Sequence, residues 1–155
     1  MADTQIIIVD DHPLFRDAMK AALSASSEKL VISEAGSLDE ATTRLGNGKD
    51  CDLILLDLKM PGVQGLSGLA YLRAQYPDVP VAIVSGQEET AIVRRAMALG
   101  ASGYIPKSTS ADVMRAAVAA ILAGDIWAPA TNAEPTAQER EIDDLSKRLA
   151  TLTPQ

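Results

Sequence analysis

The sequence predicts an α/β fold in which a five-stranded parallel sheet is covered by helices on both faces. Between residues 5 and 124, five short apolar runs alternate with five segments of helical periodicity. The apolar runs are continuous, which is typical of strands buried on both faces of a parallel sheet. Such a repeat joins its strands by right-handed crossovers, so the helices must pack on the two sides of the sheet.

The predicted strands are short, aliphatic and bounded by turn signals. They are residues 5–9, 30–35, 52–56, 79–85 and 103–105. The clearest is the third, DLILLD, because four aliphatic residues run unbroken between two acidic ones. A short run bounded in this way favours a buried strand over half of a hairpin.

The predicted helices have recognisable start and stop signals. They run from Pro13 to about Ser24, from Ser37 to Gly46, from Leu66 to Gln75, from Glu88 to Leu99 and from Ala111 to Ala123. Pro13 is preorganised for a first helical position. Ser37 and Glu40 form a capping-box pattern, Ser110 can cap the last helix, and Gly124 stops it.

Composition and charge limit the classes of function. The chain has 155 residues, enough for one domain, and 47% hydrophobic with only 3% aromatic residues predicts an aliphatic core. The formal net charge of -7 argues against direct binding of nucleic acid or an anionic membrane, which relies on clustered Lys and Arg. A single cysteine, Cys51, and the lack of a leader or membrane-spanning run favour a cytoplasmic location.

The chain changes character after Gly124. We expect residues 1–124 to form one domain and residues 125–155 to form a linker whose first part is rich in Ala and Pro. Trp127 is expected to pack back onto the domain. Apolar residues then recur at coiled-coil spacing at Ile142, Leu145, Leu149 and Leu152. This spacing predicts an amphipathic helix that serves as a linker or a dimer contact.

Polar and charged residues stand at the carboxyl ends of four predicted strands. They are Asp10, Asp11, Asp57, Ser85 and Lys107. In a doubly wound sheet of strand order 2-1-3-4-5, the first and third strands are neighbours and their carboxyl ends form the crevice where ligands bind. The three carboxylates would therefore converge there. Taken singly, Asp57 and Ser85 could equally be caps, and Lys107 a solvated surface charge.

The predicted carboxylate cluster suits phosphoryl transfer. Three adjacent carboxylates repel one another unless a cation lies between them. Oxygen ligands, with neither His nor Cys in the predicted cluster, suit a hard ion such as Mg²⁺. An Asp carboxylate can act as the nucleophile and form an acyl phosphate, while an ammonium and a hydroxyl stabilise the transferred group. These roles fit Asp57, Lys107 and Ser85.

Together these motifs resemble the receiver domain of a two-component response regulator. The matching residues are Asp10-Asp11, Asp57 within DLKMPG, Ser85-Gly86, and Tyr104 and Lys107 within GYIPKS. The resemblance covers roughly residues 6–124 and implies a flavodoxin-like receiver fold.

The resemblance implies that Asp57 accepts a phosphoryl group from a sensor histidine kinase. Asp10, Asp11, Asp57 and the backbone carbonyl of Lys59 would hold Mg²⁺, with Mn²⁺ as an alternative ion. Such a domain is a regulatory phosphoacceptor that promotes only its own phosphorylation and dephosphorylation, and it is not an enzyme acting on other substrates.

The resemblance also implies a means of reading out the phosphate. Ser85 and Tyr104 would be a switch pair, in which the hydroxyl moves to the phosphoryl group and the aromatic ring follows it inward. Lys59 and Gln87 occupy the flanking positions that tune phosphate lifetime. The only histidine, His12, is expected to be an exposed flank of the first helix, with the phosphodonor histidine belonging to the partner.

The run DDHPLFR further resembles receivers of the NarL/FixJ subfamily, which precede a LuxR-type helix-turn-helix domain. The final residues LTPQ resemble the start of that DNA-binding domain. We therefore expect the chain to end where an effector begins, the output to be transcription, and DNA to be contacted only through that absent domain. A homodimer is a further expected assembly. A free receiver with a helical tail is the alternative.

Two other functions remain open on the sequence. A Mg²⁺-dependent phosphatase that forms an aspartyl phosphate would carry a second Asp two residues after the nucleophile, and Lys59 occupies that position. The other function is a phosphorylation-independent module that uses the receiver fold only to bind a protein. The presence of the acidic cluster with Ser85 and Lys107 gives that module little support.

Overall fold

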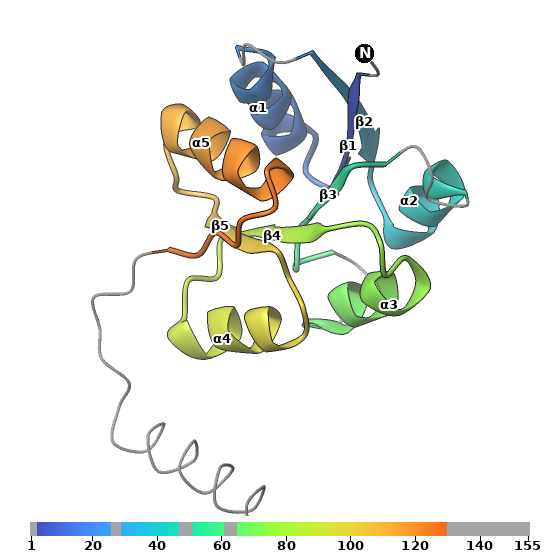
Figure 1. Ribbon diagram of the computed structural model, residues 1–155, viewed down its shortest axis with the longest axis vertical. Coiled ribbons are helices and arrows are strands. Elements are labelled where there is room, and N and C mark those ends of the chain that lie inside the picture. Colours follow the sequence, from blue (N-terminus) through green and yellow to red (C-terminus); the bar gives the residue numbers. More distant parts are fainter. Residues whose placement is uncertain (1–2, 26–28, 47–50, 61–64, 130–155) are drawn as a thin grey trace, which may run out of the picture.

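Five strands form one parallel sheet in the order β2-β1-β3-β4-β5, and a helix follows each strand (Figure 1). This computed structural model describes residues 3–25, 29–46, 51–60 and 65–129. The elements are β1 Thr4–Val9, α1 Pro13–Ser24, β2 Leu30–Ala35, α2 Leu38–Leu45, β3 Leu53–Leu56, α3 Ser67–Gln75, β4 Val81–Ser85, α4 Thr90–Ala98, β5 Gly103–Pro106 and α5 Ala111–Leu122. The predicted fold class and strand order are confirmed.

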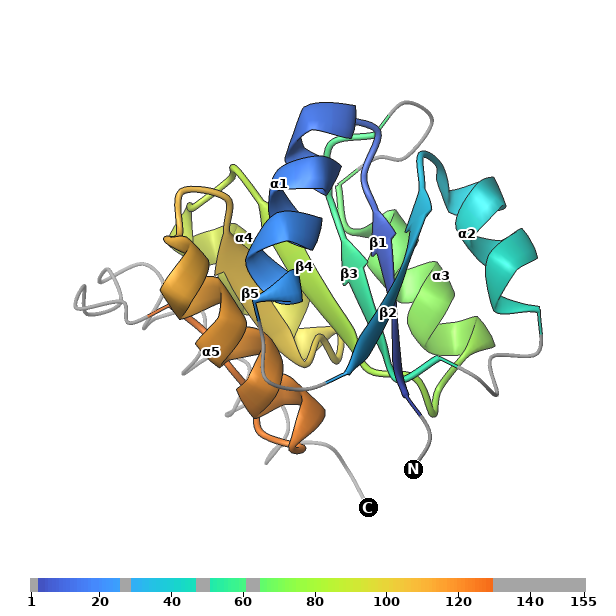
Figure 2. The ribbon, with the colours of Figure 1, turned by 90° about the horizontal axis from the view of Figure 1, so that it is seen from above.

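The helices cover both faces of the sheet. α1 and α5 lie side by side on one face, and α2, α3 and α4 lie on the other (Figure 1, Figure 2). Successive side chains of a strand point to opposite faces. Ile6 and Ile8 of β1 therefore pack in the core with α1 and α5, whereas Ile7 and Val9 pack in the core with the other three helices. Burial on both faces explains why the strands are continuous apolar runs.

Two helices begin at the predicted capping serines. Ser37 Oγ accepts a hydrogen bond from the Glu40 N–H at 3.1 Å, and Ser110 Oγ accepts one from the Val113 N–H at 3.3 Å. The Glu40 carboxylate accepts from the Gly36 N–H, one residue further back than a capping box requires. The predicted helix starts are therefore correct, and the predicted reciprocal bond is replaced by a neighbouring one.

Several predicted boundaries shift by one or two residues. β4 begins at Val81 rather than at residue 79, because Pro80 has no N–H to donate to the sheet. α4 begins at Thr90 rather than at residue 88, because Glu89 has an extended backbone with ψ of 131°. β5 continues to Pro106, which pairs with Ser85. The carboxyl end of β4 stays at Ser85, as predicted.

Trp127 ties the segment after α5 to the edge strand of the sheet. The backbone N–H of Trp127 donates to the Ser102 carbonyl at 3.1 Å, and the backbone carbonyl of Trp127 accepts from the Tyr104 N–H at 3.0 Å. The prediction that Trp127 packs back onto the domain is correct. The predicted amphipathic helix near the C-terminus lies outside the described residues. In the described ranges, no helix combines the length and the apolar character that crossing a bilayer requires.

Gly103 lies where β5, α5 and Trp127 meet. A Cβ atom added there would lie 2.6 Å from Ile121 Cδ1 and 3.0 Å from the Trp127 carbonyl oxygen. We expect Gly103→Ala to lower the free energy of unfolding by about 1–3 kcal/mol, because the added methyl overpacks this contact. Urea unfolding measures the loss. Gly86→Ala is the matched control, since a Cβ there meets no described heavy atom within 4 Å; equal losses in both variants would contradict the overpacking.

Candidate functional site

The carboxyl ends of the strands bring the predicted site residues together. β1 and β3 pair up to their last residues, so Asp10 and Asp57, which follow them, are neighbours. β4 ends at Ser85, whose carbonyl accepts a hydrogen bond from the Lys107 N–H at 2.8 Å. Asp11 lies one residue beyond Asp10, at the entrance to α1. The predicted convergence at this edge of the sheet follows from parallel strand pairing.

Lys107 pairs with two buried carboxylates. Its Nζ lies 2.9 Å from Asp10 Oδ2 and 3.3 Å from Asp57 Oδ2. Asp10 and Asp57 are only 1% and 2% exposed. One ammonium therefore serves two adjacent carboxylates, and the group keeps a net negative charge.

Burial and mutual repulsion separate the pKa values of the two carboxylates. The pKa of Asp57 is raised, chiefly by burial and then by the charge of Asp10, while Lys107 acts in the opposite direction. Burial is also the largest influence on Asp10, but hydrogen bonds from Lys107 and His12 together outweigh it and lower the pKa of Asp10. Asp10 is therefore the firmly charged partner of Lys107. Asp57 is the carboxylate whose ionisation is more costly.

His12 lies within the acidic cluster, which the sequence reasoning missed. Its Nδ1 lies 2.8 Å from Asp10 Oδ1, 3.1 Å from Asp11 Oδ1 and 3.6 Å from Asp57 Oδ2. The side chain is 55% exposed, so the expected exposure is correct, yet one nitrogen faces the carboxylates. The prediction of a cluster without histidine is therefore wrong. Its position directly after the acidic pair was the available sequence signal.

The oxygen and nitrogen atoms of the cluster could be ligands of a divalent cation. One ligand atom each from Asp10, Asp11, His12 and Asp57 lie within 4.8 Å of one another. Three of the carboxylate oxygens are buried, and two of them share the single ammonium of Lys107. One ammonium leaves the negative charge of the buried carboxylates only partly balanced, and a bound cation would supply the rest. The exposed Lys59 donates its backbone N–H to Asp57, and its carbonyl as a ligand stays a prediction.

Ser85 and Tyr104 are joined through the backbone of Gln87. The Gln87 N–H donates to Ser85 Oγ at 3.1 Å, and the Tyr104 hydroxyl donates to the Gln87 carbonyl. Both side chains are fully buried. Burial is the main cause of the raised pKa of Tyr104, so the phenol stays neutral and remains a donor. The predicted switch residues and Gln87 thus form one connected group, and their motion stays a prediction.

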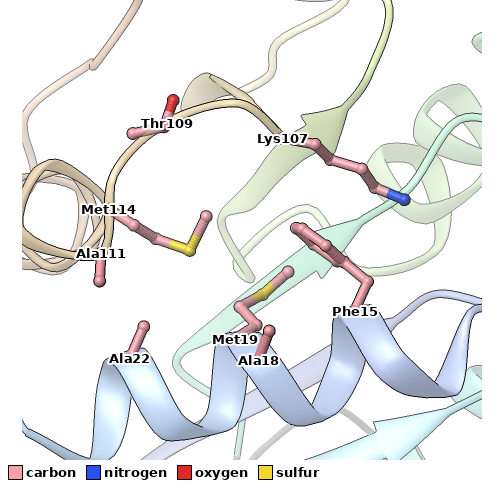
Figure 3. Close-up of a pocket in the computed structure, with 8 residues that line it drawn as sticks. All are labelled: Phe15, Ala18, Met19, Ala22, Lys107, Thr109, Ala111 and Met114. Carbon is pink, nitrogen blue, oxygen red and sulfur yellow. The ribbon is translucent and has the colours of Figure 1, made fainter.

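Phe15 of α1 lies under the Lys107 ammonium, a contact that the sequence reasoning also missed. The Lys107 Nζ lies 4.5 Å from the centre of the Phe15 ring, within the range of a cation–π interaction. Figure 3 shows Lys107 reaching across this ring at the rim of a largely apolar cavity of about 170 Å³. The helical pattern of α1 could place Phe15 on the sheet side but could not reveal its partner.

Residues 6–119 match the family model of the response regulator receiver domain. The matched range includes Asp10, Asp57 and Lys107, which the structure brings into contact. The chain belongs to the response regulator receiver family.

Related proteins agree with this assignment. The receiver is 42% identical over 125 residues to the glycerol metabolism activator of Pseudomonas putida, with 81% of this chain and 57% of that protein covered. It is 36% identical over 123 residues to the transcriptional regulatory protein DegU of Brevibacillus brevis, with 79% and 52% covered. The chain thus spans little more than half the length of these curated relatives.

Solved structures extend the agreement to three dimensions. A LuxR family DNA-binding response regulator from Silicibacter pomeroyi is 35% identical, with a TM-score of 0.73 over 82% of this chain and 98% of that one. The signal receiver domain of NarL from Mycobacterium tuberculosis is 31% identical, with a TM-score of 0.70 over 80% and 99%. The predicted receiver family and its NarL-type relatives are confirmed.

We expect the charge of Asp57 to lower the stability of this receiver at neutral pH. Its pKa is higher in the folded chain than in the unfolded chain, so the protonated carboxyl stabilises the folded state. This stabilisation is fully present below the unfolded pKa and is lost as pH rises through the folded pKa. At pH 7 without divalent cations, Asp57→Asn should therefore raise the free energy of unfolding by about 1–2 kcal/mol. Lys107 keeps its pair with Asp10 in this variant.

Urea titrations of the two proteins at pH 7 and at acid pH measure this gain, which should shrink as the wild-type carboxyl becomes protonated. The exposed Asp78 supplies a matched control, because its replacement by Asn removes an equal charge outside the cluster. An Asp57→Asn variant that is less stable than the wild type at pH 7 would contradict the expectation.

Proposed function

We propose that this receiver accepts a phosphoryl group on Asp57 from a sensor histidine kinase in a Mg²⁺-dependent reaction. The observation that best supports this is the double contact of Lys107, at 3.3 Å from Asp57 and 2.9 Å from Asp10. It sets an ammonium beside a buried carboxylate whose raised pKa makes it the more basic of the pair. A more basic carboxylate is the better nucleophile toward phosphorus.

Each side chain then has a defined part in the transfer. One oxygen of Asp57 forms a bond to phosphorus as the bond between phosphorus and the donor nitrogen breaks. Lys107 neutralises negative charge on the phosphoryl oxygens. The oxygen of the Ser85 hydroxyl accepts from the Gln87 N–H, and its hydrogen would turn from the neighbouring Tyr104 hydroxyl to a phosphoryl oxygen.

The cation would be held by Asp10, Asp11 and Asp57 with the backbone carbonyl of Lys59. Buried carboxylate oxygens whose charge is only partly balanced by Lys107 support this ligand set. Mg²⁺, or Mn²⁺ in its place, supplies positive charge that balances the carboxylates and the phosphoryl oxygens when bound. An exposed Lys59, where a related phosphatase would carry its acid/base Asp, supports a regulatory rather than an enzymatic role.

The phosphate would be read out through Ser85, Gln87 and Tyr104. A Ser85 hydroxyl that turns toward the phosphoryl group releases the Gln87 N–H. The Gln87 carbonyl accepts from Tyr104, so the loop and the ring would move together. Lys59 and Gln87 flank the site and would set the phosphate lifetime by hindering or guiding the hydrolytic water.

The output would be transcription in the cytoplasm. Relatives named as transcriptional regulators, such as DegU, support this output. Residues 1–124 would form the phosphoacceptor domain, and residues 125–155 would form a linker to a LuxR-type helix-turn-helix domain that contacts DNA. A homodimer is the proposed active assembly.

The test is phosphate uptake measured on the intact protein. The chain is incubated with Mg²⁺ and a small acyl phosphate and then weighed by mass spectrometry. We expect a gain of one phosphoryl group that a chelator prevents. Multiple turnover on free phosphate esters would instead favour a phosphatase, and partner binding indifferent to phosphate would favour a phosphorylation-independent module.

Phe15 should influence the rate of this uptake through Lys107. Replacing Phe15 by Leu keeps an apolar side chain but removes the ring beneath the ammonium. We expect the initial rate to fall about two- to fivefold, which corresponds to the strength of an exposed cation–π contact. Stopped-flow phosphorylation measures it. Leu14→Ala on the same helix is the control, since Leu14 is 85% exposed, and an equal fall in both variants would count against the contact.

A further inference from the structure

His12 is held over the carboxylates by its own backbone. Pro13 follows it as the first residue of α1, and a residue before proline is restricted to extended geometry. His12 has φ of -99° and ψ of 100°, and its N–H donates to Asp10 Oδ1 at 2.9 Å. Its Nδ1 lies 2.8 Å from the same oxygen. His12 is therefore anchored to Asp10 through both its backbone N–H and its ring.

The distances from His12 Nδ1 are those of ligand atoms around one ion. An ion about 2.0–2.2 Å from each ligand sets neighbouring ligand atoms roughly 2.8–3.6 Å apart in octahedral or tetrahedral geometry. Nδ1 lies 2.8, 3.1 and 3.6 Å from oxygens of Asp10, Asp11 and Asp57. All four ligand atoms lie within 4.8 Å of one another, so movement of the side chains inward by a few tenths of an ångström would bring them around one cation.

Lys107 shares Asp57 Oδ2 with this cluster, but on Asp10 it contacts a different oxygen from His12. Its Nζ pairs with Oδ2 of Asp10, whereas His12 Nδ1 contacts Oδ1 of the same carboxylate. The carboxylate thus has the ammonium on one oxygen and the imidazole on the other. A cation between His12 and the three carboxylates leaves the pair between Lys107 and Asp10 intact.

We propose that His12 Nδ1 is a ligand of the cation. The affinity of the receiver for Zn²⁺ or Co²⁺, divided by its affinity for Mg²⁺, is therefore higher than the carboxylates alone would give. Imidazole is a good ligand for Zn²⁺ and related transition ions, whereas Mg²⁺ prefers oxygen. This inference rests on the carboxylate site of the proposed function. It adds a nitrogen ligand and, with it, an ion preference.

The test exploits the single histidine of the chain. In a Cys51→Ser background, which removes the only thiol, calorimetry compares the affinities of the full chain and of His12→Asn for Mg²⁺, Co²⁺ and Zn²⁺. We expect the ratio of Zn²⁺ to Mg²⁺ affinity to fall at least about tenfold in His12→Asn. In ¹⁵N-histidine-labelled protein, one imidazole is observed, and Zn²⁺ should shift its Nδ1 resonance.

Asp57→Asn is the matched control, because removing a shared oxygen ligand should weaken both ions and leave their ratio little changed. A ratio that His12→Asn leaves within about twofold, or a Zn²⁺ shift at Nε2 alone, overturns the inference. If the chain takes up phosphate but the ratio of Zn²⁺ to Mg²⁺ affinity is the same in His12→Asn, the inference fails and the proposed function stands. If it takes up no phosphate while Zn²⁺ shifts Nδ1, the proposed function fails and the histidine ligand stands.

Discussion

Asp57→Asn is expected to gain no phosphate under conditions in which the wild-type chain gains one phosphoryl group. The variant keeps the size of the side chain at the end of β3 but lacks the anionic oxygen that attacks phosphorus. Asp10 is as buried and as close to Lys107, but its lowered pKa makes it the less basic carboxylate and so the weaker nucleophile. We expect the initial rate to fall by at least about 10³-fold. Intact-mass spectrometry over time measures both proteins.

Asp52→Asn is the control for this loss. Asp52 lies at the opposite end of the same strand, is exposed, and accepts a hydrogen bond from the Gln5 N–H at 2.8 Å. The Asp52→Asn variant should take up phosphate as the wild type does, although it has lost the same charge as Asp57→Asn. Equal uptake by Asp57→Asn and the wild type would assign the acceptor to another residue and would falsify the proposal.

Lys107→Met is expected to lower the rate of uptake on the order of 10²-fold while leaving Asp57 in place. The methionine keeps most of the length of the side chain, including its packing near Phe15, but removes the ammonium 3.3 Å from the acceptor carboxylate. Charge on the transferring phosphoryl group then loses a fixed counter-charge in a buried site, and removal of one such group typically costs this much. The same time course by mass spectrometry measures the effect.

Affinity for Mg²⁺ separates this role of Lys107 from a loss of the cation. Removing a competing positive charge beside Asp10 and Asp57 should let Mg²⁺ bind more tightly to Lys107→Met, whereas Asp57→Asn should bind it more weakly. Lys20→Met is the control, because Lys20 of α1 pairs with Glu34 of β2 instead of with Asp10 or Asp57. Weaker Mg²⁺ binding by Lys107→Met, or uptake as fast as in Lys20→Met, would contradict the assigned role.

The architecture and much of the site could be predicted from the sequence. Unbroken aliphatic runs such as Leu53–Leu56, bounded by turn signals and alternating with helical segments, predict strands buried on two faces of a parallel sheet. Parallel strands carry their carboxyl ends to one edge. Asp10, Asp57 and Lys107 had to meet there once the strand order was assumed, and the structure brings the Lys107 ammonium within 3.3 Å of both carboxylates.

Other features depend on side-chain direction, which only the tertiary structure decides. His12 follows the acidic pair in the sequence, but its nitrogen reaches Asp57 only because β3 lies beside β1 and Pro13 holds the backbone extended. Phe15 lies under Lys107 because α1 and β5 approach one another in space, far apart along the chain. Local periodicity fixes which face of an element a residue occupies, whereas the partner on that face comes from another element. The composition of this cluster, with a histidine among its carboxylates, is therefore a property of the fold.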